Sequence, residues 1–129
     1  MASSPDFRQR LASGKILFLD GGMGTMLQAA GMPPGVPPEE FCLNQPATLL
    51  KIQKEYAAAG ADIITSCTFG ANRFKLSPGL NVFEVNRKLV ELAREAARAA
   101  APDRRIYIAG DVGPQATSPG RWEIWIRKS

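Results

Sequence analysis

An acidic residue followed by glycines ends a short apolar run near the start of the chain. The sequence there is KILFLDGGMGT, in which Ile16 to Leu19 are apolar and Asp20, Gly21 and Gly22 follow. A carboxylate at this position can hold an ammonium group, and glycines let a ligand approach the backbone closely. Amides at the opening of a following helix can hold a carboxylate. A ligand with both groups is an α-amino acid, which makes these three residues candidate binding residues.

The same residues also have a purely structural interpretation. Gly21-Gly22 would then be a tight turn and Asp20 a helix cap, and this segment alone does not decide between the two. The GGxG spacing differs from the GxGxxG of dinucleotide-binding proteins. No Gly-Lys-Ser/Thr follows, as a phosphate-binding loop requires.

Two later segments place further polar groups after apolar runs. In TSCTFGANRFKL, strand alternation would turn Ser66 and Thr68 toward a pocket together and point Cys67 the other way. In GDVGPQ, Asp111 is either another acid at the same rim or a cap of the next turn. We interpret Cys67 as a small buried hydrophobe, since no histidine is present to activate it, and Cys42 as equally inert.

Strand and helix patterns alternate along the chain. We expect strands at residues 16–19, 61–69 and 105–113, and helices at residues 4–11 (capped by Ser4), 24–30, 46–60 and 82–100. The inward face of the last helix is predicted to carry Val82, Val85, Leu89, Leu92 and Ala96. Residues 32–46 contain five prolines, and we predict a loop there.

This order predicts parallel strands joined by right-handed crossovers. The nearly equal βα intervals favour an α/β fold made of the first three βα units of a (β/α)8 TIM barrel, with a doubly wound sheet as the rival. Both folds need more residues than the 129 present, so we expect an incomplete domain. We assign residues 1–14 to a lead-in, 15–120 to the partial barrel and 121–129 to an atypical tail, which is either a short edge strand or sequence outside the domain.

Composition narrows the classes of partner. The net charge is +4, but the basic residues are scattered and alternate with acids on helical faces, which favours a solvated surface over nucleic-acid binding. We find no signal sequence or membrane span. Two cysteines do not make a disulfide framework, so we expect a cytoplasmic protein.

Four segments together resemble the homocysteine S-methyltransferase family, in particular the N-terminal homocysteine-binding modules of cobalamin-dependent methionine synthases. They are LDGGMGTMLQ, FCLNQPATLLKIQKEYAAAGADIITSCTFGANRFKL, VFEVNRKLVELAREAA and AGDVGPQ, between Ile16 and Gln115. The resemblance implies a (β/α)8 barrel that binds homocysteine and zinc at the carboxyl ends of its strands. Zinc would hold the substrate sulfur as a thiolate, and a donor such as methylcobalamin would deliver the methyl group.

The resemblance also implies roles for individual residues. Asp20 matches the acid that receives the amino group of homocysteine, and Gly21 and Gly22 match the backbone that meets its carboxylate. Ser66 stands where the family usually has a threonine that contacts the amino acid. Cys67 stands where methionine synthases often carry asparagine.

The zinc ligands of the family are missing from this sequence. The family uses three cysteines from later strands, whereas this chain has two in unrelated segments and no histidine. We therefore assign no metal ligand and no catalytic residue. The expected partners are homocysteine, the remaining barrel and cobalamin or folate modules. The alternative function is a stand-alone amino-acid-binding or interaction module without catalysis.

Overall fold

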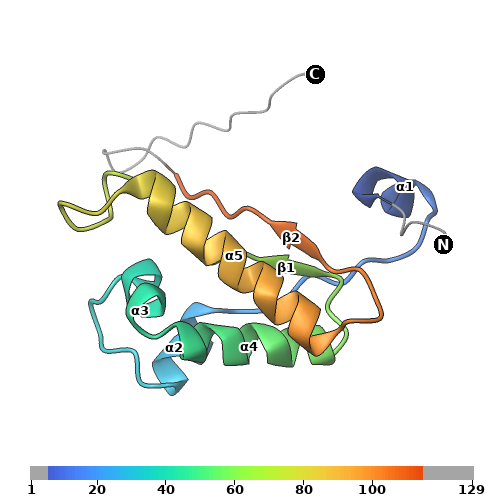
Figure 1. The fold of residues 1–129 in the computed structure, drawn as a ribbon, viewed down its shortest axis with the longest axis horizontal. Coiled ribbons are helices and arrows are strands. Elements are labelled where there is room, and N and C mark those ends of the chain that lie inside the picture. The colour runs from blue at the N-terminus through green and yellow to red at the C-terminus, as the bar shows by residue number, and fades with distance from the viewer. Residues whose placement is uncertain (1–5, 115–129) are drawn as a thin grey trace.

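The computed structural model describes residues 6–114, which form a layer of helices against a small parallel sheet (Figure 1). In chain order the elements are α1 (Phe7–Ala12), α2 (Gly24–Ala29), α3 (Pro38–Asn44), α4 (Pro46–Ala58), β1 (Ile63–Thr65), α5 (Val82–Ala100) and β2 (Tyr107–Ala109). None of the helices in this part of the chain combines the length and the apolar composition that a membrane crossing needs.

The sheet is parallel, as the alternating pattern predicts. In the register of β1 and β2, Ile63 pairs with Tyr107 and Thr65 with Ala109. Leu19 forms an isolated parallel bridge to Ile63, and the carbonyl oxygen of Phe18 accepts hydrogen bonds from the start of β1. The predicted first strand is therefore reduced to a single bridge beside β1.

The two faces of the sheet have different surroundings. Ile64 is fully buried on the face that α4 and α5 cover, in a cluster with Ala57 and Ala93. The opposite face carries Ile63 and Tyr107, by alternation, and α1 reaches it through a contact between the rings of Phe7 and Tyr107, whose centroids lie 5.2 Å apart.

The apolar segment at residues 16–19, which is predicted as a strand, is largely exposed in this structure. The side chains of Ile16, Phe18 and Leu19 are 79%, 63% and 59% exposed. Within residues 6–114, the two long helices pack on one side of the sheet only, so nothing there covers the apolar side chains of this segment.

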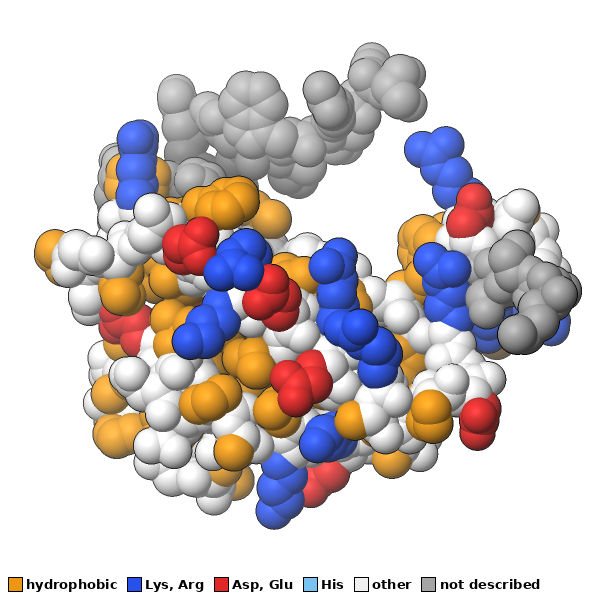
Figure 2. Space-filling view, in the orientation of Figure 1, with side chains coloured by type: hydrophobic (Ala, Val, Ile, Leu, Met, Phe, Trp, Pro, Cys, Tyr) orange, Lys and Arg blue, Asp and Glu red, His pale blue; other side chains and the backbone are white. Residues whose placement is uncertain are grey.

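The long helices form as their patterns predict. Of the predicted inward residues of α5, Val85, Leu89, Leu92 and Ala96 are buried and Val82 is half-buried. The helix begins after Asn81, whose side chain accepts a hydrogen bond from the amide of Glu84 at 3.0 Å. Charged side chains of both signs lie over its outer face (Figure 2), which fits the expected solvated surface.

Two helix predictions need correction. The proline-rich segment predicted as a loop contains α3, in which Pro38 opens the helix and Glu39 and Glu40 lie in its first turn. Proline suits the first turn because its missing N–H is not needed there, and acids favour the positive end of the helix dipole. The first helix begins after Asp6, which forms a reciprocal capping box with Gln9, whereas the predicted cap, Ser4, lies outside the described residues.

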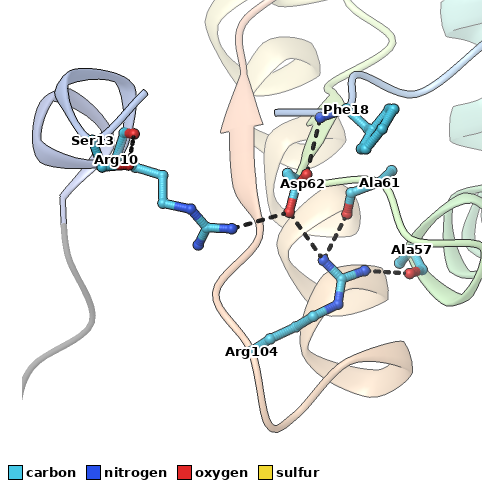
Figure 3. Close-up of polar contacts among 7 residues, drawn as sticks. All are labelled: Arg10, Ser13, Phe18, Ala57, Ala61, Asp62 and Arg104. Atoms are coloured by element: carbon cyan, nitrogen blue, oxygen red, sulfur yellow. Dashed lines mark hydrogen bonds and ion pairs between the residues drawn. The ribbon is translucent and has the colours of Figure 1, made fainter. Parts of the chain in front are cut away.

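A cluster of charged side chains, made by Asp62, Arg10 and Arg104, connects the segment before Asp20 to the start of β1 (Figure 3). The Asp62 carboxylate accepts a hydrogen bond from the Phe18 amide at 2.9 Å and lies 3.5 Å from the Arg10 guanidinium and 3.7 Å from that of Arg104. Arg104 also donates to the carbonyl oxygens of Ala57, in the last turn of α4, and Ala61, which follows the helix. These contacts hold the amino end of the sheet and set the position from which residues 18–20 run toward the opposite end.

Candidate functional site

Asp20 is fixed at the carboxyl end of β1 by its own side chain. Its Oδ2 atom accepts hydrogen bonds from the Thr65 amide at 3.0 Å and from the Thr65 hydroxyl at 3.1 Å. Its amide donates to the carbonyl oxygen of Ile63 at 2.9 Å. Within residues 6–114 no hydrogen bond or ion pair uses its other carboxylate oxygen, Oδ1, and the side chain is only half-buried. One oxygen is therefore an anchor and the other is available to a ligand.

The interpretation of Asp20 as a helix cap is wrong. The residue that precedes α2 as its N-cap is Met23, which makes no side-chain capping bond. The Asp20 carboxylate is instead committed to Thr65. The Asp20 side chain thus connects the segment that follows the Leu19–Ile63 bridge to β1. It accepts no hydrogen bond from the amides of α2.

The Gly21-Gly22 turn is constrained by Tyr56 of α4. A Cβ atom at Gly21 would lie 2.8 Å from the Tyr56 hydroxyl oxygen, and that hydroxyl donates to the carbonyl oxygen of Gly22 at 2.7 Å. A side chain at position 21 would therefore force Tyr56 to shift, so packing favours glycine there. The amides of both glycines have no hydrogen-bond partner within residues 6–114, and both residues are exposed. The turn is held through its carbonyl while its N–H groups remain available.

Ser66 and Thr68 lie together, as strand alternation predicts, but they do not line a pocket. Their hydroxyl oxygens are 2.6 Å apart, and Thr68 donates to the carbonyl oxygen of Asp111 at 2.7 Å. Both hydroxyls also lie 3.2 Å from the Asp111 amide nitrogen, and Ser66 is fully buried. This network joins the ends of β1 and β2. The role of Ser66 as a substrate contact stays a prediction.

Cys67, predicted to point away from the pocket, faces it, and its neighbours Ser66 and Thr68 do not. Cys67 has a φ of 57°, in the left-handed region that non-glycine residues rarely adopt. Thr65, Cys67 and Phe69 line the pocket whereas Ser66 and Thr68 do not, so alternate residues still share a side, in the opposite sense to the prediction. The sequence pattern does not indicate which of the two sets faces the pocket.

A pocket of about 560 Å³ lies beside these strand ends. Its lining includes Thr65 at the end of β1, Cys67 after β1, Asp111 after β2, Glu39 from α3, and Lys75 from the loop before α5. Glu39 is 5% exposed, and one of its oxygens accepts a hydrogen bond from the Gly70 amide at 2.6 Å. A larger hollow of about 830 Å³ lies between α3 and α5, but no residue of the strand ends lines it.

Acidic side chains dominate the electrostatics at the strand ends. Partial burial raises the pKa of the Asp111 carboxyl, and the nearby carboxylates of Asp20 and Glu39 raise it further. The Asp111 carboxylate makes no hydrogen bond within residues 6–114, so it is not a turn cap there. Such a site favours a cationic group over an anionic one.

Two charged residues of the pocket lining, Glu39 and Lys75, are not among the site residues predicted from the sequence. Glu39 lies in α3, in the segment predicted as a loop, although Pro-Pro followed by Glu-Glu is typical of a helix start. The Lys75 ammonium lies 5.3 Å from the centre of the Phe69 ring. No pattern in the sequence indicates this contact.

The two cysteines are buried and in contact. Cys42 is fully buried, Cys67 is 6% exposed, and their Sγ atoms are 3.9 Å apart. The contact with Cys42 and burial raise the pKa of the Cys67 thiol. This environment agrees with the interpretation of Cys67 as a small buried hydrophobe, because a reactive cysteine needs a stabilised thiolate.

The donor set in this part of the chain does not fit the zinc site that the resemblance implies. Between residues 6 and 114, no group of three or more histidine, cysteine, aspartate or glutamate side chains is placed to hold a metal ion. A catalytic zinc site normally takes three protein ligands. The two thiols contact each other and have no third ligand beside them.

The sequence of this chain matches a known family of methyltransferases. The model of the family described as homocysteine S-methyltransferase matches residues 17–123, and the chain belongs to this family. Its parallel α/β arrangement is similar to part of a TIM-barrel methyltransferase.

Individual proteins of the family are similar to this chain over most of its length. The methionine synthase of Mycobacterium tuberculosis is 32% identical over 117 residues, which cover 83% of this chain and 10% of that protein. The homocysteine methyltransferase MmuM from Escherichia coli, in its metallated form, aligns with a TM-score of 0.71 at 26% identity. That alignment covers 83% of this chain and 41% of MmuM. The apo form of MmuM aligns with a TM-score of 0.65 at 27% identity, over 86% of this chain and 40% of MmuM. The chain thus spans about two fifths of the solved relative and a tenth of the methionine synthase.

Proposed function

We propose that this chain provides the amino-acid-binding part of a homocysteine S-methyltransferase, built on the first three βα units of a (β/α)8 barrel. One observation carries the proposal: Asp20 is anchored to Thr65 through Oδ2 while Oδ1 has no partner in the described residues. In this arrangement an ammonium group can bind the open oxygen without disturbing the anchor. Membership of the family makes homocysteine the substrate we propose.

The residues of this chain would bind and orient the substrate. The ammonium group of homocysteine would pair with Asp20, and its carboxylate would accept hydrogen bonds from the amides of Gly21 and Gly22. Ser66 stands where the family usually has a threonine that contacts the amino acid, and its hydroxyl, which is bonded to Thr68 in this structure, would serve the same role. With the ammonium and carboxylate groups of homocysteine both bound, the thiol end of the substrate would extend toward a methyl donor.

The chemistry at sulfur depends on groups outside the described residues. Methyl transfer needs a thiolate, which zinc supplies where a zinc site is present. The donor set of residues 6–114 does not fit zinc, so this activation would come from groups outside them. Methylcobalamin is the donor we propose, on the resemblance to cobalamin-dependent methionine synthases.

The domain bounds, the partner modules and the cellular location are proposed from the sequence and from the length of the relatives. We propose residues 15–120 as the barrel portion, and the remaining βα units together with cobalamin or folate modules as its partners. The match to a tenth of a methionine synthase supports partners of this kind. The cytoplasm remains the proposed location. The tail at 121–129 lies outside the described residues.

The proposal is tested by calorimetric titration of the chain with homocysteine and two truncated analogues. One analogue is the thiol acid that lacks the amino group, and the other is the aminothiol that lacks the carboxylate. We expect each analogue to bind at least about tenfold more weakly, because each loses one charge-assisted contact. Equal affinity for homocysteine and the thiol acid would contradict the role of Asp20.

A further inference from the structure

Two buried thiols lie in contact beside the strand-end pocket. Cys42 belongs to α3 and Cys67 directly follows β1, and their Sγ atoms are 3.9 Å apart. Both thiols are free. Neither takes part in the substrate contacts proposed above.

We propose that Cys42 and Cys67 form an intramolecular disulfide bond when the protein is exposed to a hydroperoxide. A disulfide needs an S–S distance of about 2.05 Å, so the two sulfur atoms must approach by roughly 1.9 Å. Rotation of the two side chains and a small shift of backbone can supply this approach. Cys67 lies outside the strand ladder, and its backbone makes no hydrogen bond within residues 6–114. It is therefore the more adjustable partner.

The pocket gives one of the two thiols access to a small oxidant. Cys67 lines the pocket of about 560 Å³ and is 6% exposed, whereas Cys42 is fully buried behind it. Cys67 is therefore the sulfur that meets the peroxide first, and Cys42 is the resolving thiol.

The chemistry proceeds in two balanced steps. The Cys67 thiolate attacks one oxygen of the peroxide, so that an S–O bond forms, the O–O bond breaks and hydroxide leaves. The Cys42 thiolate then attacks the resulting sulfenic sulfur, forming the S–S bond and expelling a second hydroxide. The two thiol protons convert the hydroxides to water. Two electrons pass from the thiols to the peroxide, which is the only oxidant required.

The surroundings make the first step slow at neutral pH. The contact with Cys42 and burial raise the pKa of Cys67, and the carboxylates of Glu39 and Asp111 add to this effect. Lys75 is the cationic side chain that lines the same pocket. Because the thiolate is the nucleophile, the oxidation rate should rise about tenfold per pH unit while the thiol remains mostly protonated.

The disulfide would join α3 to the end of β1. Glu39 lies in the first turn of α3, one turn before Cys42, and accepts a hydrogen bond from Gly70 across the pocket. The cross-link would therefore fix the wall of the pocket that carries Glu39. It would also close a loop of 25 residues in the unfolded chain. We expect the Tm to rise by about 5–15 °C on oxidation.

The test treats the folded chain with hydrogen peroxide and follows intact mass, a non-reducing peptide map and Tm. We expect a species lighter by two hydrogen atoms, with the peptides of Cys42 and Cys67 linked and the Tm raised. Dithiothreitol should reverse both changes, whereas it leaves any oxidised methionine as the sulfoxide. The variants Cys42→Ser and Cys67→Ser should show neither the link nor the rise in Tm.

The wild-type peptide map decides the question even if a serine variant fails to fold. The urea-unfolded chain provides the control for general thiol reactivity under the same peroxide exposure. Two free thiols in the folded chain, under conditions that oxidise the unfolded chain, would overturn the proposal. A disulfide found only between separate chains would overturn it as well.

Discussion

The carboxylate of Asp20 accepts hydrogen bonds from both the amide and the hydroxyl of Thr65 through a single oxygen atom. This bond orients the side chain without using its second oxygen. The residue that the sequence proposes for ligand binding is therefore held by the sheet itself. The position of Asp20 depends on β1, and its availability to a ligand depends on the residue being only half-buried.

Asp20→Asn should weaken homocysteine binding by about 1.5–3 kcal/mol, since it removes the charge that pairs with the ammonium group. Asparagine can still accept the hydrogen bonds of Thr65 through its carbonyl oxygen, so the fold should be retained. Isothermal titration of both proteins measures the change. Asp103→Asn is the matched control, because Asp103 is an exposed acid in the turn before β2. Unchanged affinity in a folded Asp20→Asn variant would show that another group holds the ammonium.

Gly21→Ala should destabilise the fold by about 1–3 kcal/mol, because the new methyl group overlaps the hydroxyl of Tyr56. Gly24→Ala is the control within the same motif, since no atom lies within 4 Å of the position that its Cβ would take. We expect Gly24→Ala to be neutral or stabilising by up to about 1 kcal/mol, because alanine favours the helix. Urea denaturation compares the two. A Gly21→Ala variant as stable as the wild type would mean that Tyr56 does not constrain the turn.

The buried thiol of Cys67 should make stability fall at alkaline pH. Its pKa is raised in the folded state, so the unfolded chain, with a thiol pKa of about 8.5, releases the proton first. The stabilisation is fully present below that value and decreases as pH rises above it, by at most about 1.4 kcal/mol per pH unit. Urea denaturation under reducing conditions measures the slope.

Cys67→Ala provides the reference for this pH effect. Alanine keeps a Cβ atom at the left-handed backbone position and removes only the titrating group. The difference in unfolding free energy between wild type and variant should shrink from about pH 8 to about pH 10. A difference that stays constant over this range would show that Cys67 ionises equally in both states.

The purified chain should contain no stoichiometric zinc and should not methylate homocysteine. Two thiols in mutual contact, without a third ligand in the described residues, are a poor zinc site. A free thiol substrate is only a few per cent ionised at neutral pH, so its attack on a methyl donor is slow. Metal analysis after dialysis and a methyl-transfer assay test this, with MmuM as the positive control. About one zinc retained per chain would point to a site shared between chains.

Much of the fold could be predicted from local patterns. The bounds of α5 match the pattern at Val82 to Ala100, and α4 begins at Pro46 as predicted and ends at Ala58, two residues before the predicted end. Asp20 could be found because an acid and two glycines after an apolar run are a local signal. Parallel pairing also follows from the alternation of elements.

Other features depend on contacts that no local pattern records. The burial of Ser66 and the left-handed backbone of Cys67 depend on how the loops after β1 and β2 meet. Coverage of the apolar side chains at Ile16 and Phe18 depends on elements on the far side of the sheet, which residues 6–114 do not provide. The approach of Cys42 to Cys67 depends on α3, a helix that the prolines concealed.

The most direct measurement of the central claim is a titration of isotope-labelled chain with homocysteine, followed by NMR at individual residues. The account predicts that the amide signals of Gly21 and Gly22 and the carboxyl signal of Asp20 shift together and saturate with one Kd. The amides of Ser77 and Leu80, which line the separate hollow between α3 and α5, should not move. Saturable shifts confined to that hollow, with Gly21, Gly22 and Asp20 unchanged, would contradict the account.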